Sequence, residues 1–265
     1  MITSPANARM KAVIHMQQKA KARREADAFL TEGVKMFLEA PIERIREVYI
    51  SESFSCSGKE KEAAVLKKLK KVPHEQVSGE VFRRISDTCA PQGILCVMQA
   101  YHYTLEDLLK NQNPLLLILE DIQDPGNLGT MLRTAEGAGV DGILLSQNTA
   151  DIYNPKTIRA TMGSIYRMPF FYTADLKGAM QTLQARGVVL YAAHLRGEKA
   201  YDDCDYTGGS AFLIGNEGNG LKKETAELAD MYMKIPMAGS VESLNAGIAA
   251  GILMYEAARQ RRRAE

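Results

Sequence analysis

Short apolar runs alternate along this chain with longer segments in which apolar residues recur every three or four positions. The clearest run is the segment 115–119, which reads LLLIL and is bounded by turn-forming residues on both sides. A run of this length predicts a strand that is buried on both faces, as strands of parallel sheets are. Comparable strands are predicted at 142–145, 188–193, 211–214 and 231–235, with helices between them and a long final helix over 245–262. Strands that alternate with helices indicate an α/β fold with a mostly parallel sheet.

The first hundred residues show the same alternation on a smaller scale. A basic helix is predicted over 7–24, and its sparse apolar face indicates an arm or a capping helix. The other elements expected here are a helix at 34–39, a strand at 47–50, a Lys-rich helix at 60–70, a strand at 95–99 and a short helix at 105–110. The polar segment 111–114 is the best linker candidate. We therefore expect two domains, one over residues 1–108 and one over residues 113–265.

The strand at 115–119 leads through a turn into a predicted helix. Asn127 stands where a helix cap is expected, and Arg133 lies further inside the helix. Loops at the carboxyl ends of parallel strands bind ligands in open α/β folds, so both residues are site candidates. A plain cap and a solvated arginine would explain the same residues equally well. The loop that follows the strand at 115–119 has no nucleotide-binding pattern, because Gly126 is followed by Asn127, Leu128 and Gly129 rather than by the spacing Gly-x-Gly-x-x-Gly. The glycine-rich segment 215–220 is not followed by the residues of a P-loop.

Three more stretches have the composition of functional loops. Lys156 and Arg159 stand beside a small-residue turn, an arrangement suited to phosphate. The predicted strand before Gly215 runs into a glycine-rich turn with one carboxylate, Glu217. The segment 235–245 combines a strand end, a loop and a helix cap, and small residues follow it. Ordinary loop chemistry would explain each stretch taken singly.

Composition and charge narrow the class of protein. Hydrophobic residues make up 46% and charged residues 25%, as in globular proteins. The net charge is +1, but residues 1–110 hold 18 Lys and Arg against 14 Asp and Glu, with a dense basic start over 9–24 and a second cluster over 67–71. These clusters are either solvated helix faces or a patch that follows phosphates. The 4 cysteines and 4 histidines have no zinc-ligand spacing, so no metal is expected. No apolar run is long enough to cross a membrane, and we expect the protein in the cytoplasm.

Taken together, the stretches resemble the SpoU, or TrmH, branch of the SPOUT methyltransferases. The resemblance is carried by Asn127 with Arg133, by Gly215-Asn216-Glu217-Gly218, and by Ile235-Pro236 with Ser243-Leu244-Asn245, in the order of the family. Ala246-Gly247 departs mildly from the family pattern, which puts local helix packing in question. The resemblance covers residue 115 to the end of the final helix. The basic first half is similar to the L30e-like RNA-binding domain of many members.

The resemblance implies a fold, a reaction and a set of residues. It implies a knotted trefoil domain, a homodimer, and transfer of a methyl group from S-adenosylmethionine to a ribose 2′-hydroxyl of RNA. Main-chain groups of the second and third motif loops would hold the cofactor. The catalytic residues carried over are Arg133, Asn127, Glu217, Ser243 and Asn245, and the cofactor-binding residues are Gly215, Ile235, Leu244, Asn216, Gly218 and Leu195.

The RNA and the role of Arg133 are less closely defined. An L30e-like first domain favours 23S ribosomal RNA, while a tRNA ribose methyltransferase and a non-catalytic RNA-binding dimer are the alternatives. Arg133 is the base in the family account, but a guanidinium does not lose its proton readily, so a donor to the developing alkoxide is preferred. A Rossmann-type methyltransferase is disfavoured, because the strand at 142–145 is followed by Ser146-Gln147-Asn148 without an acidic residue for the ribose hydroxyls.

Overall fold

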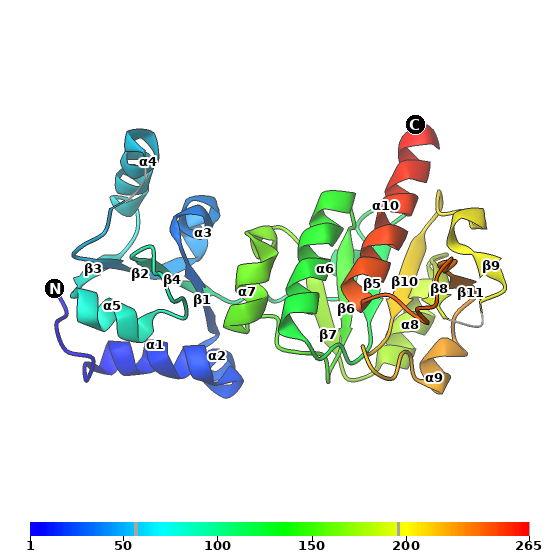
Figure 1. The fold of residues 1–265 in the computed structure, drawn as a ribbon, viewed down its shortest axis with the longest axis horizontal. Helices are drawn as coiled ribbons and strands as arrows, with labels where there is room; N and C mark the ends of the chain where they lie inside the picture. Colours follow the sequence, from blue (N-terminus) through cyan, green and yellow to red (C-terminus); the bar gives the residue numbers. More distant parts are fainter. Residues whose placement is uncertain (56–57, 195–196, 265) are drawn as a thin grey trace. The chain divides into compact units, whose positions relative to one another are not determined.

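The computed structural model describes residues 1–55, 58–194 and 197–264, which form two units (Figure 1). The first unit consists of Met1–Tyr101 and Asp151–Tyr166, and the second of His102–Ala150 and Arg167–Glu265. The chain therefore returns to the first unit after the second has begun. Within the described ranges, no helix is long and apolar enough to span a membrane.

The first unit has a four-stranded sheet in the order β1-β4-β2-β3. β4 is antiparallel to both β1 and β2, and β3 is parallel to β2. The strands are β1 (Ala28–Glu32), β2 (Ile45–Ser51), β3 (His74–Val77) and β4 (Ile94–Gln99). The helices are α1 (Ala8–Gln18), α2 (Ala20–Ala26), α3 (Val34–Glu39), α4 (Lys59–Leu69), α5 (Gly79–Ile85) and α7 (Pro155–Thr161), with 3₁₀ turns at Ile42–Arg44 and Ser164–Tyr166.

The prediction of a single basic helix over 7–24 is wrong, because Lys19 is extended, with φ −128° and ψ 120°, and divides the segment into α1 and α2. Of the two roles predicted for it, the structure favours the capping helix over the arm, since Met10, Val13 and Met16 are buried in the core that includes β1 and α5. Sparse apolar spacing is sufficient here because all three side chains fall on one side of α1.

The second unit contains a seven-stranded parallel sheet in the order β7-β6-β5-β10-β8-β11-β9. The strands are β5 (Leu115–Leu119), β6 (Gly142–Ser146), β7 (Phe170–Thr173), β8 (Val189–Ala193), β9 (Lys199–Ala200), β10 (Ser210–Ile214) and β11 (Met231–Lys234). The helices are α6 (Pro125–Ala138), α8 (Leu176–Ala185), α9 (Lys223–Ala226) and α10 (Ala246–Ala264), with 3₁₀ turns at Glu106–Leu108 and Tyr201–Asp203. The predicted α/β fold with a mostly parallel sheet is confirmed, although β7 and β9 were not predicted.

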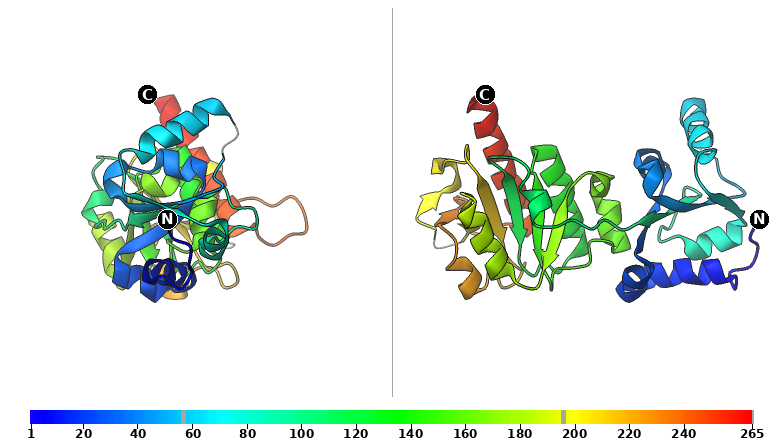
Figure 2. Two further views of the ribbon diagram at one scale, coloured as in Figure 1. Left: turned by 90° about the vertical axis from the view of Figure 1, so that its left-hand side faces the viewer. Right: turned by 180° about the vertical axis from the view of Figure 1, so that it is seen from behind.

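Helices cover both faces of this sheet. Figures 1 and 2 show α6 and α10 side by side on one face and α8 on the other. All five residues of β5 are buried, as the unbroken apolar run predicts, and β5 lies between β6 and β10. Since the strands are parallel, the loops after β5, β6, β10 and β11 leave from the same edge of the sheet, where ligands of such folds bind.

Candidate active site

The loop between β5 and α6 places Asn127 differently from the prediction. α6 begins at Pro125, and its cap is Asp124, whose Oδ1 accepts a hydrogen bond from the Asn127 backbone nitrogen at 2.8 Å. Asn127 is therefore the third residue of the helix, and its prediction as the cap is wrong. A proline in the first turn is compatible with this start, because its missing N–H would be unpaired there anyway. The side chain of Asn127 is consequently available for contacts outside the helix.

Glu217, which follows β10, binds this loop from the side. Its Oε2 accepts a hydrogen bond from the Gln123 backbone nitrogen at 3.0 Å, and its Oε1 accepts bonds from the Asp124 backbone nitrogen and the Asn127 Nδ2, both at 3.1 Å. Partial burial alone would raise the pKa of Glu217, but the hydrogen bonds outweigh this effect and hold the pKa below its ordinary value. Glu217 is thus an ionised acceptor that joins the second motif to the first.

Asn245 connects the third motif to the same cluster. Its Nδ2 donates to the Asn127 Oδ1 at 3.1 Å, while its own Oδ1 accepts from the Gly247 backbone nitrogen at 2.9 Å at the start of α10. Asn127 therefore accepts from Asn245 and donates to Glu217. The Asn245–Asn127–Glu217 chain unites residues more than a hundred positions apart in the sequence, all three of which the sequence selected.

The turn after β10 requires glycine at its first position. A Cβ on Gly215 would lie 2.1 Å from the Gly220 carbonyl carbon, which no side chain can accommodate. Asn216 stabilises the turn, because its Oδ1 accepts from the Gly218 and Asn219 backbone nitrogens at 3.0 Å and its Nδ2 donates to the Asp121 carbonyl at 2.9 Å. The turn and the end of β5 are therefore held together by side-chain hydrogen bonds.

Two acidic residues at the end of β5 were missed by the sequence analysis. Glu120 is 3% exposed and accepts a hydrogen bond from the Lys222 backbone nitrogen at 2.8 Å. Asp121 accepts from the Ser146 Oγ at 2.7 Å and forms an ion pair with the Lys222 Nζ at 2.7 Å. Burial opposes ionisation of Asp121, but Lys222 and Ser146 prevail and lower its pKa. The available signal was the pair of carboxylates directly after a buried strand, a position where charge requires partners.

Arg133 and Ser243 are not joined to this cluster. Both are exposed, and within the described ranges neither side chain makes a hydrogen bond or ion pair. Arg133 is six positions after Asn127, which places it ~9 Å further along the helix axis and roughly 120° around it. α10 packs beside α6 on a different flank, where Gly251 lies opposite Thr134. Of the five catalytic candidates, the structure thus connects three.

The cofactor candidates lie in two loops at the carboxyl edge of the sheet. Gly215, Asn216 and Gly218 form the turn after β10, and Ile235 and Leu244 belong to the loop after β11. Residues 236–244 form no backbone hydrogen bond with any other described residue, so their N–H and C=O groups are available to a ligand. Leu195 lies outside the described residues.

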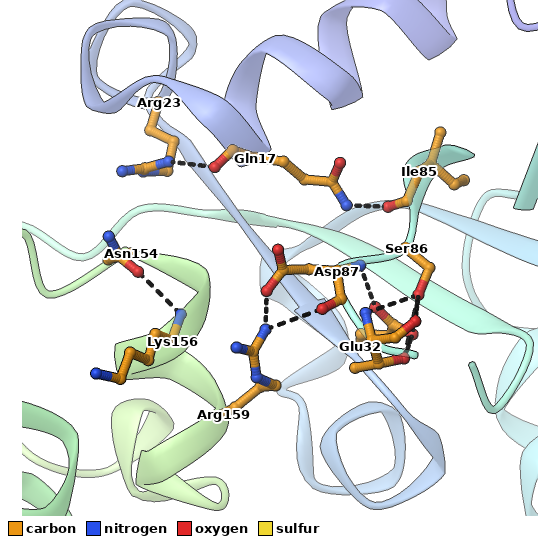
Figure 3. A network of polar contacts seen from close by, with 10 residues as sticks. Gln17, Arg23, Glu32, Ile85, Ser86, Asp87, Asn154, Lys156 and Arg159 are labelled. Atoms are coloured by element: carbon orange, nitrogen blue, oxygen red, sulfur yellow. Dashed lines mark hydrogen bonds and ion pairs between the residues drawn. The ribbon is translucent and has the colours of Figure 1, made fainter. Parts of the chain in front are cut away.

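Several basic residues expected to follow phosphates are already paired within the first unit. Figure 3 shows the Arg159 guanidinium directed at Asp87, with which it forms an ion pair. Arg23 is 5% exposed, and its Nη2 lies 2.6 Å from the Asp151 Oδ2. Asp151 precedes α7 and Arg159 belongs to it, so the two ion pairs hold the returning segment to the rest of the first unit. Among the residues that the structure describes, no group of three or more His, Cys, Asp or Glu side chains is arranged to hold a metal ion.

Comparison with known proteins identifies the family of this chain. The SpoU rRNA Methylase family matches residues 114–255, and the MRM3-like substrate binding domain matches residues 7–96. The chain is 32% identical over 243 residues to a 23S rRNA (guanosine(2553)-2′-O)-methyltransferase, RlmP, of Bacillus subtilis, covering 89% of this chain and 90% of the relative. It is also 32% identical over 226 residues to the 23S rRNA (guanosine-2′-O-)-methyltransferase RlmB of Neisseria meningitidis, covering 82% and 88%.

Solved structures resemble the chain over nearly its whole length. The SpoU methyltransferase AviRb of Streptomyces viridochromogenes, in complex with the cofactor AdoMet, superimposes with a TM-score of 0.86 at 27% identity and covers 97% of this chain and 100% of its own. An AdoMet-bound rRNA methyltransferase from Sinorhizobium meliloti has a TM-score of 0.83 at 31% identity and covers 97% of each chain. The predicted family, enzyme class and cofactor are confirmed, and the chain belongs to the SpoU rRNA Methylase family.

Proposed function

We propose that this chain transfers a methyl group from S-adenosylmethionine to a ribose 2′-hydroxyl of 23S ribosomal RNA, in the cytoplasm. The observation that carries the proposal is the hydrogen-bonded chain from Asn245 through Asn127 to Glu217, which assembles the three motifs at one edge of the parallel sheet. The names of the Bacillus and Neisseria relatives favour 23S ribosomal RNA over tRNA. The filled motif positions favour an enzyme over an RNA-binding protein without activity.

The reaction requires alignment and charge stabilisation from the protein. S-adenosylmethionine supplies the electrophilic methyl group. A ribose hydroxyl is a weak nucleophile at neutral pH, so its oxygen has to be held in line and its developing charge stabilised. The ionised Glu217 fixes the turn at Gln123 and Asp124 and orients Asn127. Asn127 and Asn245, held in this way, are the groups that position the ribose.

Arg133 is assigned to stabilise the negative charge that develops on the ribose oxygen. A guanidinium offers donors and no acceptor, so Arg133 acts as a hydrogen-bond donor to the ribose oxygen and the adjacent phosphate. Ser243 lies in the loop two residues before Asn245 and is assigned to ribose binding with it. Gly215, Asn216, Gly218, Ile235 and Leu244 would hold the adenosine, and Leu244 belongs to the unpaired backbone of 236–244.

We further infer that the chain acts as a homodimer. On α10, Ile248 is 57% exposed and Tyr255 is 50% exposed, and the Tyr255 hydroxyl lies beside Gly137 of α6. Arg133 is exposed on α6 and is turned away from Asn127 of its own chain. A two-fold contact through these helices covers the apolar side chains and brings Arg133 to the interface. The trefoil knot implied by the resemblance remains part of this proposal.

The first domain is assigned to RNA binding. Its match to a substrate binding domain over residues 7–96 and its excess of basic residues support this role. The functional boundary remains as predicted, at residues 108–113. A truncation there is a poor test, because α7, which packs on β1, would lose its partner. Point substitutions in the intact chain are preferable.

The experiment that tests the function uses the purified protein, S-adenosylmethionine and an unmodified 23S rRNA transcript. Methylation at one ribose, located by mass spectrometry and missing from cells that lack the gene, is the expected result. Methyl transfer to tRNA alone would assign another substrate. The absence of transfer to either RNA, with S-adenosylmethionine binding intact, would contradict the proposal.

A further inference from the structure

A cavity of about 360 Å³ lies in the first unit, where β2 and β3 end. It is formed by the loop after β2, by the first turns of α5 and by the segment that enters β4. A volume of this size is at the lower end of the range for small-ligand pockets. Neither the catalytic cluster nor the cofactor loops contribute to it, because all of those residues belong to the second unit.

The backbone shapes the wall of this cavity. Ser51 is the last residue of β2, and its carbonyl accepts a hydrogen bond from the Phe54 nitrogen at 2.9 Å, which turns the chain back. Gly93, with φ +76°, closes against the turn, since a Cβ there would lie 3.3 Å from both the Phe54 Cδ2 and the Ser51 Cβ. The Glu52 Oε1 accepts from the Gly79 nitrogen at 2.9 Å and ties the loop to α5. The cavity is therefore present without a ligand.

The lining combines three kinds of group. Phe54 is half-buried, and Phe82, which is 2% exposed, provides a second apolar surface. The Ser51 and Ser53 hydroxyls lie 3.0 Å apart and supply donors and acceptors. Arg83 is exposed on α5 and makes no ion pair or hydrogen bond with any residue in the described part of the chain. Among the described residues that line the cavity, none is acidic, and the nearby Glu52 carboxylate is already bonded to Gly79.

These groups match an unpaired nucleotide. A base stacks on an aromatic side chain and uses its edges for hydrogen bonds, while a cation binds the phosphate, and proteins recognise unpaired RNA in this way. A base pair within a helix does not reach into a cavity of this size, because its edges remain in the groove. A purely apolar ligand would form no hydrogen bond with the serine hydroxyls and no ion pair with Arg83.

We propose that this cavity receives one unpaired nucleotide of the RNA substrate, with its base against Phe54 and its phosphate at Arg83. The inference rests on the proposed function, since it presumes an RNA substrate. The inference adds a specificity-determining site on the first unit. This site selects RNA in which one nucleotide is unpaired and can turn out of the helix. The cofactor site of the second unit is not involved.

The test uses the full chain and three variants, Phe54→Leu, Arg83→Ala and Arg84→Ala. Phe54→Leu keeps an apolar side chain but removes the flat ring. Arg84 is a matched control, because it is also exposed on α5 and free of hydrogen bonds and ion pairs to described residues but does not line the cavity. The probes are an unmodified 23S rRNA transcript and two free nucleotides, adenosine 5′-monophosphate and uridine 5′-monophosphate. Affinity is measured at several salt concentrations.

We expect Phe54→Leu to weaken RNA binding by about 5- to 100-fold, the range of one lost stacking contact. Arg83→Ala should weaken binding and reduce the salt slope by about one, as the loss of one phosphate contact does. Arg84→Ala should change neither quantity. All three variants should bind S-adenosylmethionine like the wild type. In Phe54→Leu and Arg83→Ala, the KM for RNA should rise more than kcat falls.

Several results would overturn the inference. Equal losses for Arg83→Ala and Arg84→Ala would indicate a diffuse basic surface, and unchanged affinity for Phe54→Leu would exclude stacking. Micromolar binding of a free monophosphate that RNA does not displace would assign the cavity to a free nucleotide. Failure of the proposed function is separate, because the wild type would then methylate no RNA. If the wild type methylates RNA and the variants match its kcat/KM, only the cavity inference fails.

Discussion

The contacts of Glu217 lead to a prediction about the order of the catalytic loop. In Glu217→Ala, the Gln123 and Asp124 backbone nitrogens and the Asn127 side chain all lose their acceptor. Hydrogen bonds to charged groups contribute ~1.5–3 kcal/mol when shielded, but Glu217 is largely exposed, so about 0.5–1 kcal/mol for each is the appropriate value. The three bonds together then amount to ~2 kcal/mol, which corresponds to about 30-fold in turnover if the loop must be ordered for reaction.

Glu217→Gln makes the estimate sharper. The amide oxygen can keep the two bonds made by Oε1, while the amide nitrogen faces the Gln123 N–H and loses one bond. A loss of ~1 kcal/mol, or about 5-fold, is expected. Glu224→Gln is the control, since Glu224 is exposed on α9 and makes no hydrogen bond or ion pair to the described residues.

The assay is single-turnover methyl transfer at saturating RNA and S-adenosylmethionine, with the unfolding midpoint and the cofactor affinity measured in parallel. Turnover should decrease from wild type to Gln to Ala, with the Glu224→Gln control equal to the wild type. A Glu217→Ala variant with more than a third of wild-type turnover would refute the argument that this carboxylate orders the loop. A variant that unfolds would be uninformative on catalysis, so the Gln variant then carries the comparison.

Four further predictions follow from the described geometry. Arg133→Ala should remain folded and bind S-adenosylmethionine normally but lose roughly 10²- to 10³-fold in turnover. Arg133→Lys should stay impaired, because lysine lacks the planar fork of the guanidinium. Near-normal turnover of Arg133→Ala would contradict the assigned role. Gly215→Ala should bind the cofactor at least ~10-fold more weakly by calorimetry, since its Cβ would lie 2.1 Å from the Gly220 carbonyl carbon and displace the turn. Lys222 pairs with Asp121, and the pKa of Asp121 is lowered while that of Lys222 is raised. The pair should therefore stabilise the fold between pH 3.8, the ordinary pKa of the carboxylate, and pH 10.5, the ordinary pKa of the amine. Lys222→Ala should lower the free energy of unfolding by ~1 kcal/mol or less in this range, and the difference should vanish as acid protonates Asp121. Tyr255→Glu should shift a dimer to monomer in light scattering, and an unchanged mass would count against the α10 interface.

Local pattern was sufficient for the elements whose burial is uniform. The segment LLLIL is a buried strand at the bounds expected, because five successive apolar residues require cover on both faces. Asn245 caps α10 as predicted, since its side chain needs only the backbone two and three residues on. In both cases the information lies within a few residues of each position. The motif residues Asn127, Glu217 and Asn245 were identified instead from the resemblance of the three motifs taken together, and the structure unites them.

Other features depended on distant parts of the chain, so sequence periodicity did not reveal them. Asp124, and not Asn127, caps the start of α6, so the Asn127 side chain donates its hydrogen bond to Glu217, ninety positions further along the chain. Residues 151–166 return to the first unit, where Arg23 pairs with Asp151, and only tertiary contact can bring these two charges together. Strand β9 has two residues and exists because β11 lies beside it. Local sequence thus determined where the chain is apolar, where helices are capped and where it turns. Tertiary structure decided which distant polar groups bond to one another, because a buried charge or amide needs a hydrogen-bond partner and only the fold brings that partner near.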